Sequence, residues 1–227
     1  MEHKRLTLFA GHYGSGKTNI AVNYSLHLAK EGKQVCIADL DIVNPYFRTA
    51  DSRQELESAG VELISPQFAN SNVDLPALPA QAYKLVQDKR CYGIMDIGGD
   101  DRGAYALGRY IPFMKQENDY RMVYVANCYR PLTRTAAEAL EVMQEIEAAC
   151  GLAFTDIVNN SNLATETDIQ TVLDSRDFIR ELSGLSGLPV FMTTVRADLA
   201  EGLQGQIPNV LPLHLQEKYF DLPDQKR

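Results

Sequence analysis

The chain has 227 residues, of which 45% are hydrophobic and 23% are charged, and its formal net charge is −8. This size and composition are typical of a soluble globular protein, and we expect residues 1–227 to form a single nucleotide-binding domain. The acidic balance argues against broad, non-specific binding to nucleic acid, because such binding needs clusters of lysine and arginine.

The four cysteines are far apart and form no C-x-x-C pair, which favours reduced thiols over a disulfide framework or a metal site. The first residues contain no apolar signal-peptide core, and no apolar run is long enough to cross a bilayer. The C-terminal stretch carries prolines and mixed charge, which is not typical of a membrane anchor. We therefore expect a cytoplasmic protein.

Strand patterns recur along the chain and alternate with helical patterns. The predicted strands cover residues 6–10, 34–41, 61–65, 92–99, 120–127, 155–160 and 188–194, the last being the final strand. Their nearly continuous apolar character is expected of strands that helices cover on both faces. Strands that alternate with helices predict an α/β fold, a doubly wound and mostly parallel sheet with helices on both faces.

The predicted helices have recognisable starts and stops. The first follows the loop after residue 10, places Ala21, Tyr24 and Leu28 on one face, and ends at Gly32. Another covers 80–88, and a further helix begins with Ile169, Val172 and Leu173.

Two more helices begin with a capping box. Ser52 with Glu55 starts one that Gly60 ends, and Thr135 with Glu138 starts one that ends before Gly151. In the second of these helices we expect an inward face formed by Leu140, Met143 and Ile146.

A glycine-rich octet, GHYGSGKT, lies between the first strand and the first helix and fits the phosphate-binding loop G-x-x-x-x-G-K-[ST]. Glycines let backbone N–H groups point at a phosphate, and the helix N-terminus adds its dipole. Lys17 is predicted to reach the β- and γ-phosphates, and the Thr18 hydroxyl to ligate Mg²⁺. The predicted nucleotide contacts are Gly11, His12, Tyr13, Gly14, Ser15, Gly16, Lys17, Thr18 and Asn19.

Acidic residues follow two of the predicted strands. Asp39 and Asp41 follow the second strand, and Asp96 is followed by Gly98 and Gly99. An acid at a strand end is often only a turn or helix cap. The carboxyl ends of the strands, however, are where such sheets bind ligands, so these acids are candidates to hold magnesium beside the γ-phosphate.

Together, the glycine loop, the D-x-D segment and the D-x-G-G segment resemble the MinD/ParA-type P-loop ATPases of the SIMIBI class. That group also includes the nitrogenase iron protein and the carbon monoxide dehydrogenase maturation ATPases. The resemblance extends from Leu6 to about Gly202. It implies an ATP-driven switch that dimerises with nucleotide in the interface.

The resemblance also implies roles for the acids and glycines. Asp41 would position the hydrolytic water and Asp39 would support the metal region. Asp96 would hold a magnesium-bound water, while Gly98 and Gly99 would sense the γ-phosphate. The metal set is therefore Thr18, Asp41 and Asp96, and the catalytic set is Lys17, Asp41 and Asp39. The cofactors would be ATP and Mg²⁺.

The segment DIVNNSN resembles the family's adenine-binding segment, with Asn160 as the best candidate and Asn159 as the alternative. An asparagine amide can pair with the N6/N7 edge of adenine. An asparagine-rich turn is the structural alternative. No N-K-x-D segment of the kind associated with guanine is present, which favours ATP.

One departure from the family pattern concerns the lysine that reaches across the dimer to the partner's phosphates. His12 stands at that position, and a neutral histidine lacks the permanent charge of lysine. Arg48 or Arg102 could replace the lysine, although a solvated surface arginine is the favoured interpretation for each. The paired cysteines of the nitrogenase-like branch are absent, so no iron–sulfur cluster is expected.

The leading hypothesis is an ATP-hydrolysing switch and homodimer that acts on a soluble protein client, such as a metalloenzyme undergoing maturation or activation. We expect no nucleic-acid partner and no membrane anchor. The alternative is a small-molecule kinase or ATP-dependent ligase, with an acceptor pocket in the loop 66–79. The residues VNPYFR, which include Asn44, Tyr46, Phe47 and Arg48, would suit either a partner-binding switch or packing against the next helix.

Overall fold

The computed structural model describes residues 2–40, 49–64, 82–98 and 107–215. Its described strands form one eight-stranded sheet in the order β3-β2-β4-β1-β5-β6-β7-β8, and all neighbouring strands are parallel. The strands are β1 Leu6–Ala10, β2 Val35–Leu40, β3 Glu62–Ile64, β4 Tyr92–Ile97, β5 Tyr120–Ala126, β6 Asp156–Asn159, β7 Val190–Arg196 and β8 Val210–Leu213. The predicted α/β class and parallel sheet are confirmed.

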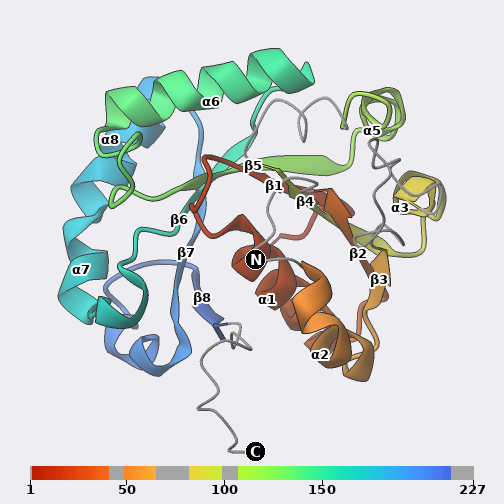
Figure 1. Ribbon diagram of the computed structural model, residues 1–227, viewed down its shortest axis with the longest axis horizontal. Coiled ribbons are helices and arrows are strands. Elements are labelled where there is room, and N and C mark those ends of the chain that lie inside the picture. Colours follow the sequence, from red (N-terminus) through yellow and green to blue (C-terminus); the bar gives the residue numbers. More distant parts are fainter. Residues whose placement is uncertain (1, 41–48, 65–81, 99–106, 216–227) are drawn as a thin grey trace, which may run out of the picture.

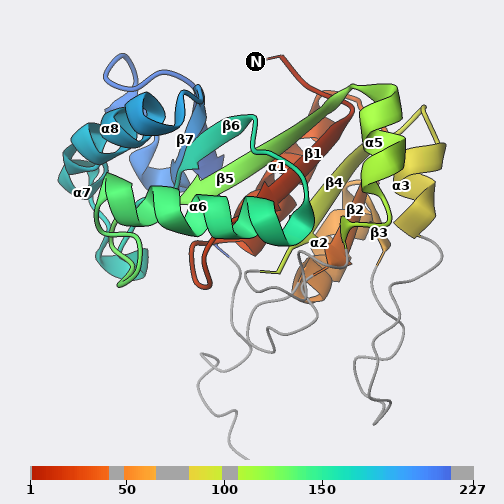
Figure 2. The ribbon, with the colours of Figure 1, turned by 90° about the horizontal axis from the view of Figure 1, so that it is seen from above.

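Helices cover both faces of this sheet (Figure 1). Helices α1 and α2 lie on one face, and α3, α5, α6 and α8 lie on the other, as the view from above also shows (Figure 2). The helices are α1 Lys17–Lys30, α2 Arg53–Ser58, α3 Tyr83–Gln87, α5 Ile111–Glu117, α6 Ala136–Cys150, α7 Ile169–Asp174 and α8 Arg176–Ser186.

Side chains of the central strand β1 point alternately to the two faces of the sheet, and each face has its own half of the hydrophobic core. Leu6 and Leu8 pack with α3, α5, α6 and α8, whereas Phe9 packs with α1. All three side chains have 0% exposure because β1 lies between β4 and β5 and is covered on both faces. After β1, the strands β2, β3 and β4 lie on one side of β1, and the chain then crosses to β5 on its other side. Such a reversal of strand order opens a ligand crevice at the carboxyl ends of the strands.

Of the two capping boxes predicted from the sequence, the one at α6 is present and the one at α2 is not. Thr135 accepts a hydrogen bond from the Glu138 backbone N–H, and the Glu138 carboxylate accepts one from Thr135 N–H, so the predicted capping box is present. Ser52 makes no side-chain cap hydrogen bond, and the capping box predicted there is wrong. The reason is that the 3₁₀ turn η1, Thr49–Ser52, leads directly into α2 and gives Ser52 a turn conformation rather than an extended one.

The structure contains elements that the sequence patterns did not predict. Strand β8 pairs with β7, so the segment 188–194 is not the final strand as predicted. Helix α5 begins with Pro112 in its first turn. The helix predicted from Ile169 breaks at Ser175 into α7 and α8. Within the residues described, no helix is long and apolar enough to cross a membrane.

The capping box at α6 gives a prediction of stability. Thr135→Ala removes the side-chain acceptor and should lower the free energy of unfolding by about 1 kcal/mol, the usual contribution of an N-cap. Thr135→Ser keeps an acceptor oxygen and should lose only a small part of this. Urea denaturation of the three proteins measures the difference, and equal stabilities for all three would contradict the assigned cap.

Candidate functional site

The predicted phosphate loop connects β1 to α1 at the carboxyl edge of the sheet. Gly16 caps α1 in a left-handed conformation, with φ of 94°. Inside the loop, Ser15 N–H donates to the His12 carbonyl at 3.1 Å, and the Lys17 ammonium donates to the same carbonyl at 3.3 Å. The loop therefore closes on itself and folds the Lys17 side chain back over it, leaving that residue only 5% exposed.

Two glycines of the loop are needed because other backbone and side-chain groups approach them closely. A Cβ at Gly11 would lie 2.7 Å from the Val125 carbonyl oxygen of the neighbouring strand. A Cβ at Gly16 would lie 2.2 Å from Nδ2 of Asn160. Both distances are shorter than any real carbon contact, so the glycines are required by packing as well as by backbone conformation.

Asn160, which directly follows β6, links the phosphate loop to β7. Its Nδ2 donates to the Ser15 carbonyl at 2.6 Å, and its Oδ1 accepts from the Thr194 hydroxyl at 2.6 Å. The residue is 3% exposed. Both ends of the amide are thus bound to the protein, and the predicted contact with adenine stays a prediction.

The alternative candidate, Asn159, is also held within the protein. Its Nδ2 donates to the Ser175 hydroxyl at 2.8 Å, and its Oδ1 accepts from the Ser161 backbone N–H at 3.1 Å. Asn159 therefore anchors the break between α7 and α8 and shapes the loop that follows β6.

Two of the predicted acids meet at the same edge. Asp39 on β2 lies directly opposite Asp96 on β4, and their exposed fractions are 4% and 0%. The Asp96 carboxylate accepts a hydrogen bond from the buried Thr49 hydroxyl at 3.1 Å. This bond ties the start of η1, directly after the segment 41–48, to the acid on β4.

The remaining candidates fall into two groups. Thr18 is 6% exposed, Asn19 is half-buried and Gly98 is buried, whereas Tyr13 projects with 54% exposure. The predicted residues Asp41 and Gly99, the arginines Arg48 and Arg102, the aromatic residues 46–47 and the loop 66–79 lie outside the described residues.

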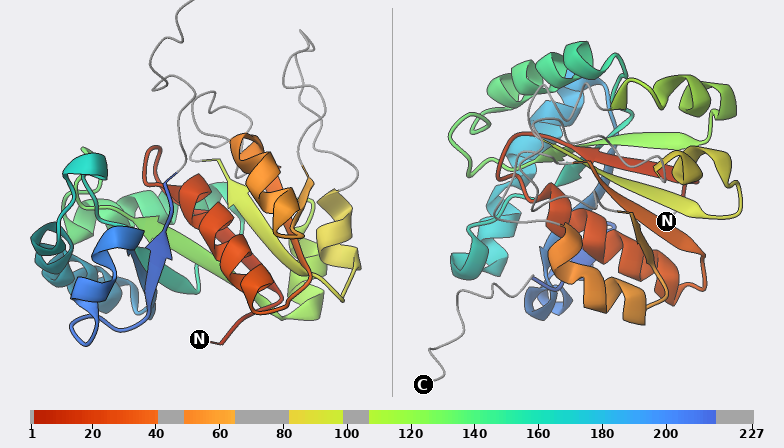
Figure 3. Two further views of the ribbon diagram at one scale, coloured as in Figure 1. Left: turned by 90° about the horizontal axis from the view of Figure 1, so that it is seen from below. Right: turned by 45° about the vertical axis from the view of Figure 1, so that its right-hand side comes forward.

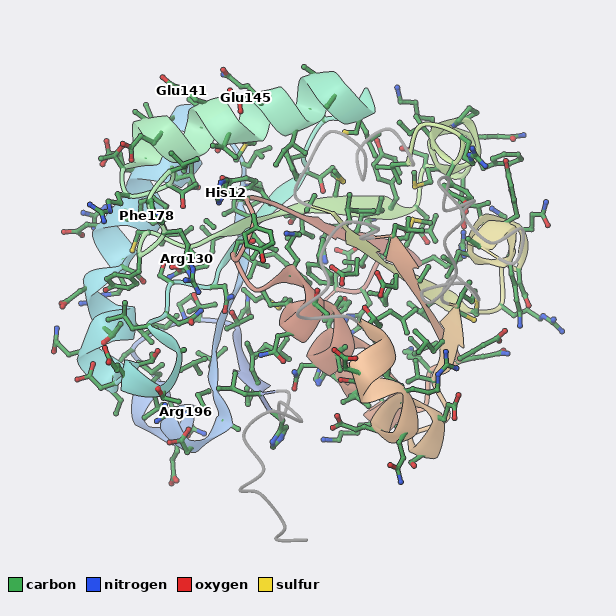
Figure 4. The ribbon with its side chains drawn as sticks, viewed as in Figure 1. His12, Arg130, Glu141, Glu145, Phe178 and Arg196 are labelled. Atoms are coloured by element: carbon green, nitrogen blue, oxygen red, sulfur yellow. The ribbon has the colours of Figure 1, made fainter. Side chains whose placement is uncertain are left out.

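Arg130, on the segment between β5 and α6, lies beside the phosphate loop (Figure 4). Its Nε would be 3.8 Å from a Cβ placed on Gly14, so the guanidinium packs against the loop. Nε is buried and has no hydrogen-bond partner within the described residues. The segment that carries it is fixed, because Thr133 donates through its hydroxyl to the Asn127 carbonyl at 2.7 Å and through its N–H to the Arg130 carbonyl at 3.1 Å.

These groups fit a magnesium–nucleoside triphosphate. The loop offers backbone donors and a lysine for phosphate oxygens, and a hydroxyl and carboxylates suit Mg²⁺, which prefers oxygen ligands. The Ser15 hydroxyl is buried in the loop without a partner in the described part of the chain, as is the Arg130 Nε. Unpartnered buried donors of this kind are costly unless a ligand such as phosphate accepts from them.

Sequence reasoning missed Thr49, Thr194 and Arg130. Each contacts a residue far away in the chain: Thr49 donates to Asp96, Thr194 donates to Asn160, and Arg130 packs against the loop at Gly14. None of them belongs to a local motif. Their position in the chain could have indicated two of them, because Arg130 and Thr194 lie at or just after the carboxyl ends of predicted strands.

No protein-family description matches the sequence, and no curated protein does so either. Solved structures do resemble the fold. The signal recognition particle receptor FtsY from Elizabethkingia anophelis has a TM-score of 0.54 and 19% identity, and the match covers 95% of this chain and 64% of that one. The signal recognition particle 54 kDa protein from Aeropyrum pernix, in complex with GDP, has a TM-score of 0.54 and 15% identity, covering 85% and 41% of the two chains.

A third similar structure is a nucleotide-binding protein from Archaeoglobus fulgidus in complex with ADP. Its TM-score is 0.52 at 18% identity, and the match covers 87% of this chain and 85% of that one. The chain spans less than two thirds of the FtsY chains it matches first, at 64%, 62% and 61% of their lengths. At these identities the likeness shows the fold alone, which is the α/β fold of P-loop nucleotide-binding proteins.

The contact between Gly16 and Asn160 gives a prediction with an internal control. Gly16→Ala should destabilise the protein in two ways, through the positive φ and through the collision with Nδ2 of Asn160. Gly32→Ala shares a positive φ of 78° but has nothing within 4 Å, so it should lose only the conformational part, about 1–2 kcal/mol.

A double variant separates the two effects. Asn160→Ala removes the colliding atom, so Gly16→Ala should destabilise the Asn160→Ala background less than it destabilises the wild type. Urea denaturation of the double-mutant cycle measures this coupling. If Gly16→Ala and Gly32→Ala have equal effects and the cycle shows no coupling, the close contact is not important for stability.

Proposed function

We propose that this protein is a P-loop nucleoside triphosphatase that works as a nucleotide-dependent switch of the SIMIBI class. The observation that carries the proposal is the arrangement at one sheet edge: a closed glycine loop with Lys17 folded over it, beside the opposed carboxylates Asp39 and Asp96. The fold shared with nucleotide-binding proteins of known structure supports this function.

Each residue of the proposed site has its own role. Backbone N–H groups of the loop and the Lys17 ammonium would bind phosphate oxygens and neutralise their charge. Thr18 would ligate Mg²⁺, and Asp96 would hold one of its water ligands, with Asp39 supporting the same region. Magnesium, when bound, neutralises charge between the β- and γ-phosphates. Asp41 is the residue that the family resemblance proposes to orient the attacking water.

We propose ATP as the nucleotide. The absence of an N-K-x-D segment supports this, and the resemblance to MinD/ParA-type ATPases points the same way. Because solved structures of this fold include complexes with both GDP and ADP, each binding experiment below uses ATP and GTP side by side. Tighter binding of GTP than of ATP would correct this part of the proposal.

Homodimerisation over the nucleotide is the proposed switch. Large apolar side chains are exposed on three segments that leave the same edge of the sheet: Tyr13 at 54%, Leu132 at 58% and Leu163 at 43%. Such residues at the rim of a ligand site suit an interface that closes when nucleotide binds. The client would be a soluble protein, with metalloenzyme maturation or activation as the family-based hypothesis.

Arg130 is placed to add positive charge to the phosphate loop of its own protomer, whereas the missing loop lysine would act across the dimer. A guanidinium is permanently charged, whereas an imidazole such as that of His12 is not. Its guanidinium packs on the loop at Gly14, and its buried Nε lacks a protein acceptor among the described residues. A phosphate oxygen of the nucleotide would supply that acceptor.

Arg130→Ala should weaken triphosphate binding, because a hydrogen bond to a charged group contributes about 1.5–3 kcal/mol. This corresponds to a loss of about tenfold to a hundredfold in affinity. Isothermal titration with a non-hydrolysable ATP analogue and with ADP measures the effect on each nucleotide. Arg134→Ala is the matched control, since Arg134 belongs to the same segment but is exposed. Equal affinities for both variants would exclude the assigned contact.

The proposed switch predicts a change in mass. Asp41→Ala should bind nucleotide without hydrolysing it, so Mg·ATP should convert a monomer into a lasting dimer in light scattering. Lys17→Ala, which removes the phosphate-binding charge, should remain monomeric under the same conditions.

A mass that stays constant although Asp41→Ala binds ATP would overturn the switch while leaving nucleotide binding intact. A small-molecule acceptor that stimulates ADP release without any protein partner would then support the kinase or ligase alternative. Substituting Leu132→Ser at the exposed rim should weaken the dimer without changing the affinity of the monomer for nucleotide.

A further inference from the structure

A cluster of potential metal ligands lies at the opposite edge of the sheet from the phosphate loop. It consists of His3, which precedes β1, together with His27 in the last turn of α1 and Glu31 immediately after that helix. One ligand atom from each residue lies within 4.8 Å of the other two. From the structure we infer that these residues form a binding site for a divalent transition-metal ion of the Zn²⁺ type, distinct from the nucleotide site.

Glu31 stands between the two imidazoles. One of its carboxylate oxygens is 3.1 Å from Nε2 of His3, and the other is 3.2 Å from Nε2 of His27. The same nitrogen of each ring therefore faces the carboxylate. Two imidazole nitrogens and a carboxylate oxygen are ligands that Zn²⁺ prefers, and with a water molecule they complete a four-ligand set.

His3 is held in position by a buried residue behind it. Its Nδ1 lies 3.0 Å from the hydroxyl of Tyr24, a residue with 0% exposure whose ring also packs edge-on against Phe9 and Phe191. If Nδ1–H donates to that hydroxyl, the Nε2 lone pair faces Glu31 and His27. A bond from the second ring nitrogen is how metal-binding histidines are usually oriented.

The position of the cluster at the end of a helix favours a bound cation. The carboxyl end of a helix carries partial negative charge, and α1 ends at Lys30, between His27 and Glu31.

Helix α1 separates this cluster from the nucleotide site. Its first residue is Lys17, so His27 lies about 15 Å further along the helix at about 1.5 Å per residue. The view from below shows the segment before β1 beside the carboxyl end of α1, with the phosphate loop at the other end of the helix (Figure 3). Metal binding at the cluster can therefore be measured without interference from magnesium bound to nucleotide.

The test is a Co²⁺ titration of the full chain without nucleotide, followed by visible absorption. The inference predicts one bound equivalent with the visible bands of Co²⁺ held by nitrogen and oxygen, displaced by Zn²⁺. His27→Ala and Glu31→Gln should each weaken binding by more than about tenfold, since even residues behind metal ligands account for about 10–100-fold. Tyr24→Phe, which removes the supporting hydroxyl, should lose affinity within that range.

His214→Ala is the matched control, because His214 is exposed and lies outside the cluster. It should bind Co²⁺ as the wild type does. Unchanged nucleotide affinity in His27→Ala shows that the variant is folded. The inference is overturned if the wild type binds no Co²⁺, if His27→Ala and Glu31→Gln bind it as tightly as the control, or if near-ultraviolet thiolate bands assign the ion to cysteine.

Discussion

Two buried carboxylates on adjacent strands impose the strongest constraint on this molecule. Asp39 and Asp96 occupy paired positions on β2 and β4, at the edge where the sheet opens, and almost no solvent reaches them. Neighbouring strands are only about 5 Å apart, so two negative charges there repel each other unless positive charge or donors compensate. The Thr49 hydroxyl is one such donor, and the phosphate loop brings Lys17 to the same edge.

The parallel sheet is what makes this concentration of charge possible. The described strands all run in the same direction, so β1, β2, β4, β5 and β6 end at one edge of the sheet. Asn160 links the phosphate loop to β7, because it donates to the Ser15 carbonyl and accepts from the Thr194 hydroxyl. A loop fixed in this way keeps its N–H groups oriented before any ligand arrives, which reduces the entropy lost on binding.

Most features that depend on neighbouring residues were predicted from the sequence. The predicted strands and the capping box at Thr135 are local and are confirmed, and the glycine octet lies between β1 and α1 as predicted. Strand β8 was missed because it is short, contains Pro212 and lies at the sheet edge, where a missing backbone donor is tolerated. The cap at Ser52 failed because a preceding turn fixed its backbone.

The same distinction holds for the candidate site. The loop residues and the acids were proposed from spacing, whereas Arg130, Thr49 and Thr194 depend on contacts between distant segments that no spacing reveals. Asn160 illustrates the limit of such patterns. Its contact with adenine stays a prediction, and the structure gives its amide two protein partners.

Asn23, in the middle of α1, exchanges hydrogen bonds with the backbone of His214: its Nδ2 donates to the His214 carbonyl at 2.9 Å, and its Oδ1 accepts from the His214 N–H at 2.8 Å. The two residues are separated by 191 positions. The segment that Asn23 binds therefore leaves the ribosome 191 residues after Asn23 itself. Until β8 has been made, the side of α1 that packs against it has no partner there, and contacts between segments this far apart form slowly because a long loop must close first.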